Sequence, residues 1–229
     1  MQRFAGNGAV AALVAASALQ RQAVVPSKEA PGLPETVATE VNKQLAAHKR
    51  QEALNVLVAH LGTTGEIDLT LLEGKKMYYV AATAGEGLSP EPGYQKDGLG
   101  GLVARPTPVR IGPAAFKQGL SWLYSSVMHE YQHVLQFHNP GAKGTTGQVP
   151  IPWLIERQEV EAYAWEILNA TKTGLDQKPK LIKENWRRLH EDHWLKLGPK
   201  GKKLMNALYV SAHAEAVRLL PGVKLGFKP

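Results

Sequence analysis

Apolar residues recur at helical spacing in five stretches of the chain, which predicts a protein built mainly of helices. The expected helices cover residues 35–61, 121–137, 153–171, 179–197 and 200–219. Glycine or proline close to the end of each stretch is a typical stop signal. The second helix is expected to begin after Gly119, with Ser121 as its candidate N-cap.

Two short segments between the first and second helices favour strands instead. Residues 76–82 (KMYYVAA) are rich in β-forming side chains, and residues 107–111 follow, with prolines at 106 and 108. Because proline cannot donate to a ladder, we expect 107–111 to be an edge strand. The glycine- and proline-rich segments 85–101 and 139–152 predict long exposed loops. This order of elements predicts an α+β fold in which helices dominate.

The composition is that of a soluble globular chain, with 44% apolar and 21% charged residues. A length of 229 residues fits one domain, 1–229. Cysteine is absent, which excludes disulfide scaffolds, cysteine zinc sites and thiol nucleophiles. Any metal must therefore bind His, Asp or Glu. No apolar run reaches 18 residues, so no membrane span is expected.

The net charge of +7 comes from the C-terminal part of the chain. Residues 1–170 carry 14 Lys and Arg against 15 Asp and Glu, whereas residues 171–229 carry 13 against 5. A solvated basic face explains this excess without any partner. The tryptophans are expected in the core or in cleft walls, and no basic-aromatic alternation accompanies them, so nucleic acid is not an expected partner. They are Trp122, Trp153, Trp165, Trp186 and Trp194.

The first 30 residues allow two interpretations. An alanine-rich stretch over 9–18 and the triplet Ala16-Ser17-Ala18 outline a weak secretory signal. Alanine is a poor substitute for the leucines of a signal peptide, and a packed N-terminal helix explains the same pattern. Both interpretations stay open at this point.

The chemistry is concentrated in His129-Glu130-Tyr131-Gln132-His133, an HExxH segment in the middle of an expected helix. Histidines at i and i+4 project from one face of a helix, so both imidazoles can bind one Zn²⁺. The glutamate after the first histidine then lies beside the metal and can take a proton from water. The sequence therefore predicts His129 and His133 as zinc ligands and Glu130 as the general base.

The amphipathic pattern of this helix supports the same interpretation. At 100° per residue, one face of this helix is apolar and carries Leu123, Tyr124, Val127, Met128, Tyr131, Val134 and Leu135. The opposite face is polar and carries Ser125, Ser126, His129, Gln132, His133 and Gln136. Both histidines are thus expected to point away from the core-forming face, toward a polar surface or a cleft.

A tetrahedral catalytic site needs a third protein ligand and leaves one position for water. The next helix offers four carboxylates, Glu156, Glu159, Glu161 and Glu166. Glu159 and Glu166 share one stripe of that helix, whereas Glu161 lies at i+4 from Arg157, which is typical of a surface ion pair. Glu159 is the expected third ligand, and Glu156 is the alternative.

These residues together resemble the gluzincin branch of zinc metallopeptidases, whose third ligand is a glutamate on a later helix. More narrowly, the chain resembles the minimal zincin toxin domains at the C-terminus of bacterial polymorphic and Rhs-type secreted effectors, including type VI-secreted ones. The residues that carry this resemblance are VRIGPAAF at 109–116, HEYQHVLQ at 129–136 and QEVEAY at 158–163, continuing through Gly174-Leu175. The resemblance covers about residues 105–180. In larger gluzincins an aspartate four residues after the ligand glutamate steadies a histidine, but here that position is Tyr163, which leaves open the group that orients His129.

The resemblance implies a small sheet beside the HExxH helix, within a catalytic core over about 75–175. The charge count and the expected helices predict a basic helical part over 176–229. The resemblance also implies secretion or delivery into a target cell, a protein or peptide substrate such as a cell-wall peptide, and a cognate immunity protein as a candidate partner. Tyr163, His138, His190 and His193 are candidates for the donor that shares the oxyanion charge. An extended substrate is expected to lie along the strand 107–111 by strand addition.

Two other function classes fit parts of the sequence. In a metal-stabilised binding module, zinc is structural and the basic C-terminal region docks a partner. In a nucleic-acid binder, the HExxH segment is incidental and affinity depends steeply on salt. The cluster His190-Glu191-Asp192-His193 also has metal-like residue types, but a solvated helix face explains it.

Overall fold

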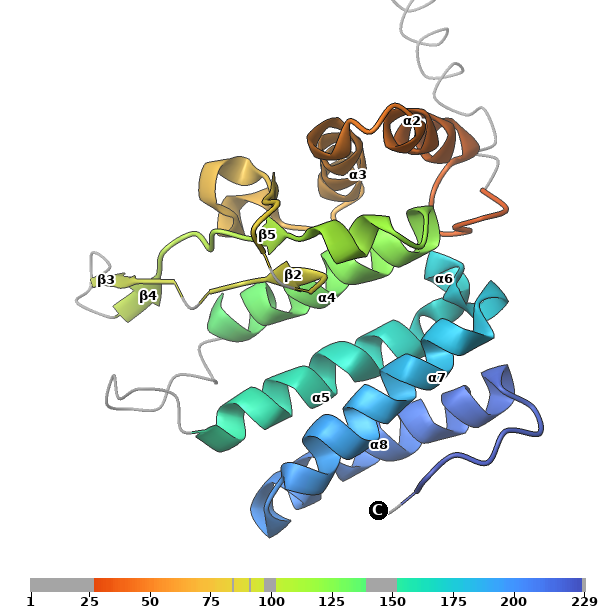
Figure 1. The fold of residues 1–229 in the computed structure, drawn as a ribbon. Coiled ribbons are helices and arrows are strands. Elements are labelled where there is room, and N and C mark those ends of the chain that lie inside the picture. The colour runs from red at the N-terminus through yellow and green to blue at the C-terminus, as the bar shows by residue number, and fades with distance from the viewer. Residues whose placement is uncertain (1–26, 84, 91, 97–101, 139–151, 228–229) are drawn as a thin grey trace, which may run out of the picture.

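The computed structural model describes residues 27–83, 85–90, 92–96, 102–138 and 152–227, and Figure 1 shows a helix-dominated α+β fold. The helices are α2 (Glu35–Ala46), α3 (Arg50–Thr63), α4 (Leu120–His138), α5 (Pro152–Leu168), α6 (Ala170–Thr173), α7 (Pro179–Arg187) and α8 (Pro199–Leu219). The strands are β1 (Tyr78–Tyr79), β2 (Gly87–Leu88), β3 (Tyr94–Lys96), β4 (Leu102–Ala104) and β5 (Arg110–Ile111). The fold class predicted from the sequence is confirmed, whereas the interpretations of residues 1–26 and of 139–151 lie outside the described residues.

The single helix expected over 35–61 is wrong, because the chain breaks after Ala46 and resumes at Arg50. His48 adopts a left-handed backbone with φ 56°, which turns the chain between α2 and α3. The break lets Val41 of α2 and Leu57 of α3 enter one hydrophobic cluster. No glycine or proline marks this position, so helical periodicity alone continues across it.

The sheet next to α4 has three short strands in the order β1-β5-β2. β1 pairs with β5 in parallel, and β2 pairs with β5 antiparallel, with Gly87 opposite Ile111. The expected edge strand 107–111 is therefore wrong, because Arg110–Ile111 is central and β2 forms an edge. The prolines 106 and 108 precede the paired residues, so both NH groups of β5 stay available.

The expected loop 85–101 is also only partly correct. Its described residues contain β2 and β3, and β3 forms a two-stranded antiparallel sheet with β4. The glycines and prolines of this segment predict a loop. The strands have only two and three residues, which is too short for an alternating pattern of apolar and polar residues to be recognised. Likewise, the strand expected over 76–82 is confined to β1.

Helix α4 begins one residue before the predicted start, and Ser121 is not its cap. Ser121 lies buried inside the helix and its Oγ donates to the carbonyl of Glu29 at 2.8 Å. The carboxylate of Glu29 accepts instead from the free NH of Leu120 at 3.1 Å. A segment 91 residues away in sequence thus satisfies the helix N-terminus.

Two of the helices expected in the C-terminal half are divided. The helix over 153–171 ends at Leu168, and α6 follows after Asn169. The helix over 179–197 becomes α7, a π-helical segment over Arg188–His193 and a 3₁₀ turn over Trp194–Lys196. None of the described helices is both long and apolar enough to span a membrane.

Helices α4 and α5 lie side by side (Figure 1), and buried hydrophobic clusters lie on both sides of the seam between them. One cluster joins α2, α3, the sheet and the apolar face of α4, including Leu57, Ile111 and Val127. A second cluster joins α5 to the π-helical segment and α8, including Val160, Leu189 and Tyr209. Trp186 and Trp194 are buried in the second cluster, and Trp122 in a third, so these tryptophans pack in the core as predicted. The polar face of α4 is consequently turned toward α5.

Candidate metal centre

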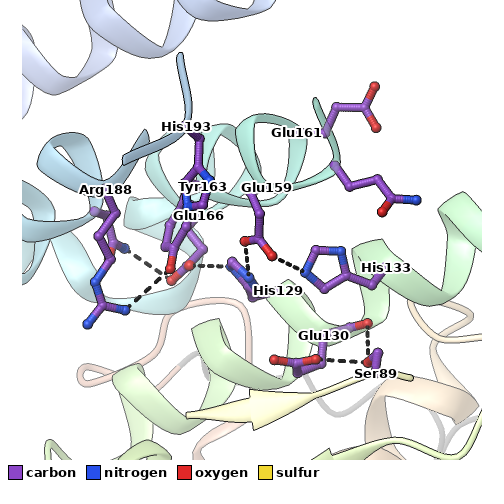
Figure 2. Close-up of polar contacts among 12 residues, drawn as sticks. Ser89, His129, Glu130, His133, Glu159, Glu161, Tyr163, Glu166, Arg188 and His193 are labelled. Atoms are coloured by element: carbon purple, nitrogen blue, oxygen red, sulfur yellow. Dashed lines mark hydrogen bonds and ion pairs between the residues drawn. The ribbon is translucent and has the colours of Figure 1, made fainter. Parts of the chain in front are cut away.

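Three predicted ligands from α4 and α5 converge at the seam between these helices (Figure 2). Nε2 of His129 lies 3.5 Å from one oxygen of Glu159, and Nε2 of His133 lies 3.5 Å from the other. One ligand atom from each residue falls within 4.8 Å of the other two. Ligands about 2.0–2.1 Å from a tetrahedral ion stand about 3.3 Å apart. The spacing and the donor types therefore fit a metal ion, and this group could hold one.

The other two carboxylates considered as ligands on α5 have different partners. Glu156 accepts from Nδ1 of His193 at 2.7 Å. Glu161 accepts from Nε of Arg157 at 3.0 Å, the i+4 pair that helical spacing predicts. Of these three glutamates, the structure brings only Glu159 to the paired imidazoles.

Glu166 orients His129, a role that the sequence left open. Its Oε1 lies 2.7 Å from Nδ1 of His129, and its Oε2 accepts from Ser125 at 2.6 Å and Asn185 at 3.0 Å. A proton on Nδ1 then leaves Nε2 free for a metal. The shared stripe of Glu159 and Glu166 on α5 was the available signal, because both carboxylates face α4.

His133 is oriented by a separate relay of side chains. Its Nδ1 lies 2.9 Å from Oε1 of Gln136, one turn further along α4. The amide group of Gln136 donates to the carbonyl of Gln158 at 3.0 Å and to Glu161 at 2.9 Å. These bonds turn the amide oxygen toward the imidazole, so Nε2 of His133 also faces Glu159. Glu161 thereby supports the site as well as pairing with Arg157.

The charges of these groups shift the pKa values of the cluster. Burial alone would raise the pKa of Glu159, but its hydrogen bond with His129 and the charges of both histidines lower that pKa to about 2. Burial alone would lower the pKa of His129, whereas the hydrogen bonds with Glu159 and Glu166 raise it well above its ordinary value. Burial and the charge of His129 lower the pKa of His133. The carboxylate of Glu159 and the two imidazoles therefore shift one another's pKa values, as expected for side chains in direct contact.

Glu130 lies beside the histidines, and only 6% of its surface is exposed. Burial raises the pKa of its carboxyl to about 7. Oε2 accepts a hydrogen bond from Ser89 at 2.8 Å, and the dashed line in Figure 2 marks this contact. Such a pKa suits a group that exchanges protons near neutral pH.

The site opens into a cleft of about 550 Å³. Its walls include Gly87, Leu88 and Ser89 from the β2 segment, Trp122, Ser126 and Phe137 from α4, Ile155 and Gln158 from α5, and Arg188 from the π-helical segment, around the histidines and glutamates described above. Arg188 donates to Tyr163 at 3.3 Å and pairs with Glu86 at 3.3 Å. Arg188 and Ser89 were not predicted from the sequence, because both contact the site from distant segments.

Among the four candidate oxyanion donors, Tyr163 lies nearest to the metal centre. Its ring contacts that of His129 edge-on, with centroids 4.6 Å apart, and it lines the cleft. His193 stacks behind Tyr163 with its Nδ1 on Glu156. His190 bonds to Tyr209 at 2.7 Å, and His138 lies 3.3 Å from the hydroxyl of Thr107. The metal-like cluster over 190–193 therefore does not extend the ligand set.

Comparison of the sequence with protein-family models, with curated proteins and with solved structures gives no match.

Proposed function

We propose that this protein is a zinc-dependent metallopeptidase of the gluzincin type. The observation that carries the proposal is the meeting of His129, His133 and Glu159 within 4.8 Å, beside the buried carboxylate of Glu130 and in an open cleft. Two imidazoles and one carboxylate are a donor set of catalytic zinc sites that keep an open position. A metal held by these three residues would lower the pKa of a bound water and would polarise the scissile carbonyl.

The side chains around this position have distinct roles in the proposal. Glu130 takes a proton from water and returns it to the leaving amine, and its pKa near 7 suits both transfers. Tyr163 donates a hydrogen bond to the oxygen that gains negative charge, while Arg188 holds the phenol through the 3.3 Å contact. Glu166 and Gln136 keep the two histidines in the tautomer and orientation that the metal requires.

The cleft also offers an extended backbone to a substrate. β2 is an edge strand of its sheet, and Gly87 and Leu88 line the cleft beside Glu130. We place an extended peptide along β2 rather than along 107–111, because β5 is already paired on both sides. Leu88, Trp122 and Ile155 would then contact apolar side chains of the substrate.

The proposed biological role is that of an antibacterial or virulence effector toxin domain, secreted or delivered into a target cell. The resemblance of residues 109–116, 129–136 and 158–175 to the toxin domains of polymorphic and Rhs-type effectors supports it. A cell-wall or protein peptide would be the substrate, and an immunity protein would be the partner. Toxicity in the periplasm or cytosol of a test bacterium, lost in Glu130→Gln, is the expected result.

The direct test of the peptidase proposal is Glu130→Gln in the zinc-loaded protein. We expect peptide hydrolysis to fall by at least about 100-fold, since general acid–base catalysis contributes about 10²–10⁴. Zinc content should stay at one ion per chain, because Glu130 is not a ligand. The substrates are an unstructured protein and purified cell-wall stem peptides.

Two further variants serve as comparisons for Glu130→Gln. His133→Ala should lose both zinc and activity, whereas Glu191→Gln, an exposed carboxylate outside the cleft, should change neither. Equal hydrolysis by Glu130→Gln and by the unmutated protein would contradict the peptidase proposal.

A second candidate, a zinc-stabilised binding module, is favoured by one observation. The 13 Lys and Arg against 5 Asp and Glu over residues 171–229 give the C-terminal helices a basic surface suited to an acidic partner. In that case Glu130→Gln would leave the function intact. Partner binding would weaken with salt and with replacement of Lys202 and Lys203 by glutamine.

A further inference from the structure

The segment Glu86–Ser89 lies against the buried base of the metal centre. The hydroxyl of Ser89 contacts two oxygens of the same residue, Oε2 of Glu130 at 2.8 Å and its main-chain carbonyl at 3.0 Å. A single hydroxyl thus connects the carboxylate to the backbone that carries it. This contact limits the rotation of the Glu130 side chain.

Gly87, in the same segment, leaves the space that Glu130 occupies. A Cβ atom at this position would lie 2.5 Å from both Cγ and Oε1 of Glu130 and 2.6 Å from its Cδ. Real Cβ contacts are essentially never shorter than 3.0 Å, so any side chain would displace the carboxylate. The backbone of Gly87 and the hydroxyl of Ser89 therefore enclose Glu130 together.

Contacts on two sides fix the segment. Gly87 and Leu88 pair with Ile111 and Arg110 of β5, and the NH of Gly112 donates to the carbonyl of Glu86 at 2.8 Å. On the other side of the cleft, the carboxylate of Glu86 pairs with Arg188 at 3.3 Å. Both partners of this ion pair are partly buried, so it is less screened than a fully exposed pair. The segment is thereby connected to both halves of the fold.

We propose that Glu86–Ser89 is a positioning strap for Glu130, in which the Ser89 hydroxyl fixes the carboxylate, Gly87 gives it room and the Glu86–Arg188 pair fixes the strap across the cleft. This inference rests on the proposed peptidase function for its effect on catalysis. Toward Glu130, Ser89 and Gly87 are positioning residues, because this effect acts through the Glu130 carboxylate and neither residue contacts the ligand atoms.

The first experiment replaces Ser89 in the zinc-loaded protein and separates kcat from KM. Ser89→Ala should lower kcat about 10- to 100-fold, the size of effect expected from a misplaced reacting group, with little change in KM. Zinc content should be unchanged. Ser89→Thr keeps the hydroxyl and should restore most of kcat. Ser211→Ala, at an exposed serine on α8, is the control and should match the unmutated protein.

The second experiment uses a matched pair of glycines. Gly87→Ala should lower kcat with zinc retained, because the new methyl group displaces Glu130. Gly93→Ala adds the same methyl group where the nearest atom lies at 3.7 Å, and should leave kcat unchanged. Thermal unfolding of both variants shows whether either change acts through stability instead.

A structural measurement distinguishes failure of this inference from failure of the proposed function. In crystals of Ser89→Ala, the Glu130 carboxylate should leave the orientation that it has in the unmutated protein. If the zinc-loaded unmutated protein cleaves no peptide, the peptidase proposal fails, and this orientation alone decides the strap. An unmoved carboxylate, or an active protein in which Ser89→Ala keeps full kcat, overturns the strap.

Discussion

Glu166 supports the candidate metal centre without belonging to the group of residues that could hold the ion. It is only 2% exposed, and its two oxygens accept from His129, Ser125 and Asn185. Two neutral donors and one imidazole hold its side chain in place. The position of His129 therefore depends on a network that α4, α5 and α7 share.

Replacing Glu166 by glutamine tests this role. We expect the affinity for zinc to fall about 10- to 100-fold, the usual effect of removing a residue that orients a metal ligand. Competition with a chromophoric chelator measures it. Glu215→Gln, whose carboxylate pairs with Arg218 on α8, should keep the full affinity. An unchanged affinity in Glu166→Gln would mean that His129 needs no oriented partner.

The residues of the metal centre differ in how far the sequence could predict them. The spacing of His129 and His133 requires only a helix, and Glu159 requires only a second helix whose stripes can be drawn. Ser89 and Arg188 have no such local signal, because Ser89 lies 41 residues from Glu130 and Arg188 lies 102 residues from Glu86. Their roles exist only once the chain is folded.

At the scale of elements, α4 and α5 place the ligands through their regular geometry. Glu159 and Glu166 are seven residues apart, two turns of one helix face, so a single contact with α4 places one carboxylate on the metal side and the other behind His129. The helix breaks around His48 and within 188–193 were not predictable from periodicity. In the second break, π-helical turns bring Arg188 to the cleft and His193 to Glu156.

A charge cluster at the end of α7 predicts a specific dependence of stability on pH. Hydrogen bonds from Arg187, and then from Arg188, lower the pKa of Glu184 from its ordinary 4.5 to about 2. A carboxylate with a lowered pKa stabilises the fold above about pH 4.5 and loses that contribution as the pH falls toward 2. Glu184→Gln should therefore lower the free energy of unfolding more at pH 6 than at pH 2.5.

Urea unfolding at the two pH values measures this difference. Glu191→Gln is the matched control, because Glu191 is more exposed and lies 3.8 Å from Arg187. Its effect should be smaller at both pH values. A Glu184→Gln effect that is equal at pH 6 and pH 2.5 would rule out the ion-pair explanation.

At the scale of the whole molecule, the candidate metal centre lies between two hydrophobic clusters. His129 and His133 belong to α4, which packs on the first cluster through residues such as Val127, whereas Glu159 belongs to α5, which packs on the second through Val160. A bound ion would therefore connect both halves. We expect zinc to raise the unfolding temperature. At a free zinc concentration 100 times Kd, the free energy of unfolding should increase by about 2.7 kcal/mol.

Calorimetry with and without zinc measures this stabilisation. His133→Ala removes one ligand and should abolish the shift while it leaves the metal-free protein folded. A zinc-induced shift of equal size in His133→Ala would indicate binding elsewhere on the chain.

The N-terminal segment is fixed to the C-terminal half at Gly174. This glycine has φ 81°, and a Cβ atom there would lie 1.7 Å from the carbonyl oxygen of Glu29. Gly222 has the same φ but no atom within 4 Å of the same position. Gly222→Ala should cost about 1–2 kcal/mol from the backbone conformation alone. Gly174→Ala should cost about 1–3 kcal/mol more, because the segment around Glu29 must move.

Chemical denaturation of the two variants gives the comparison. Equal destabilisation would show that the contact between Gly174 and Glu29 does not matter in solution. A larger loss in Gly174→Ala would show that the segment around Glu29 packs closely against Gly174 in solution.

The sequence by itself determined that helices dominate the fold, that thiol chemistry is absent and that two imidazoles are paired, because these depend on residue type and on spacing within one element. It also reduced the third ligand to a few carboxylates on one helix. Only the tertiary structure decided which carboxylate meets His129 and His133, which strand forms the edge, and that Glu166, Ser89 and Arg188 surround the site. Those contacts join segments far apart in the chain, and their geometry is set by how the two clusters pack across the α4–α5 seam.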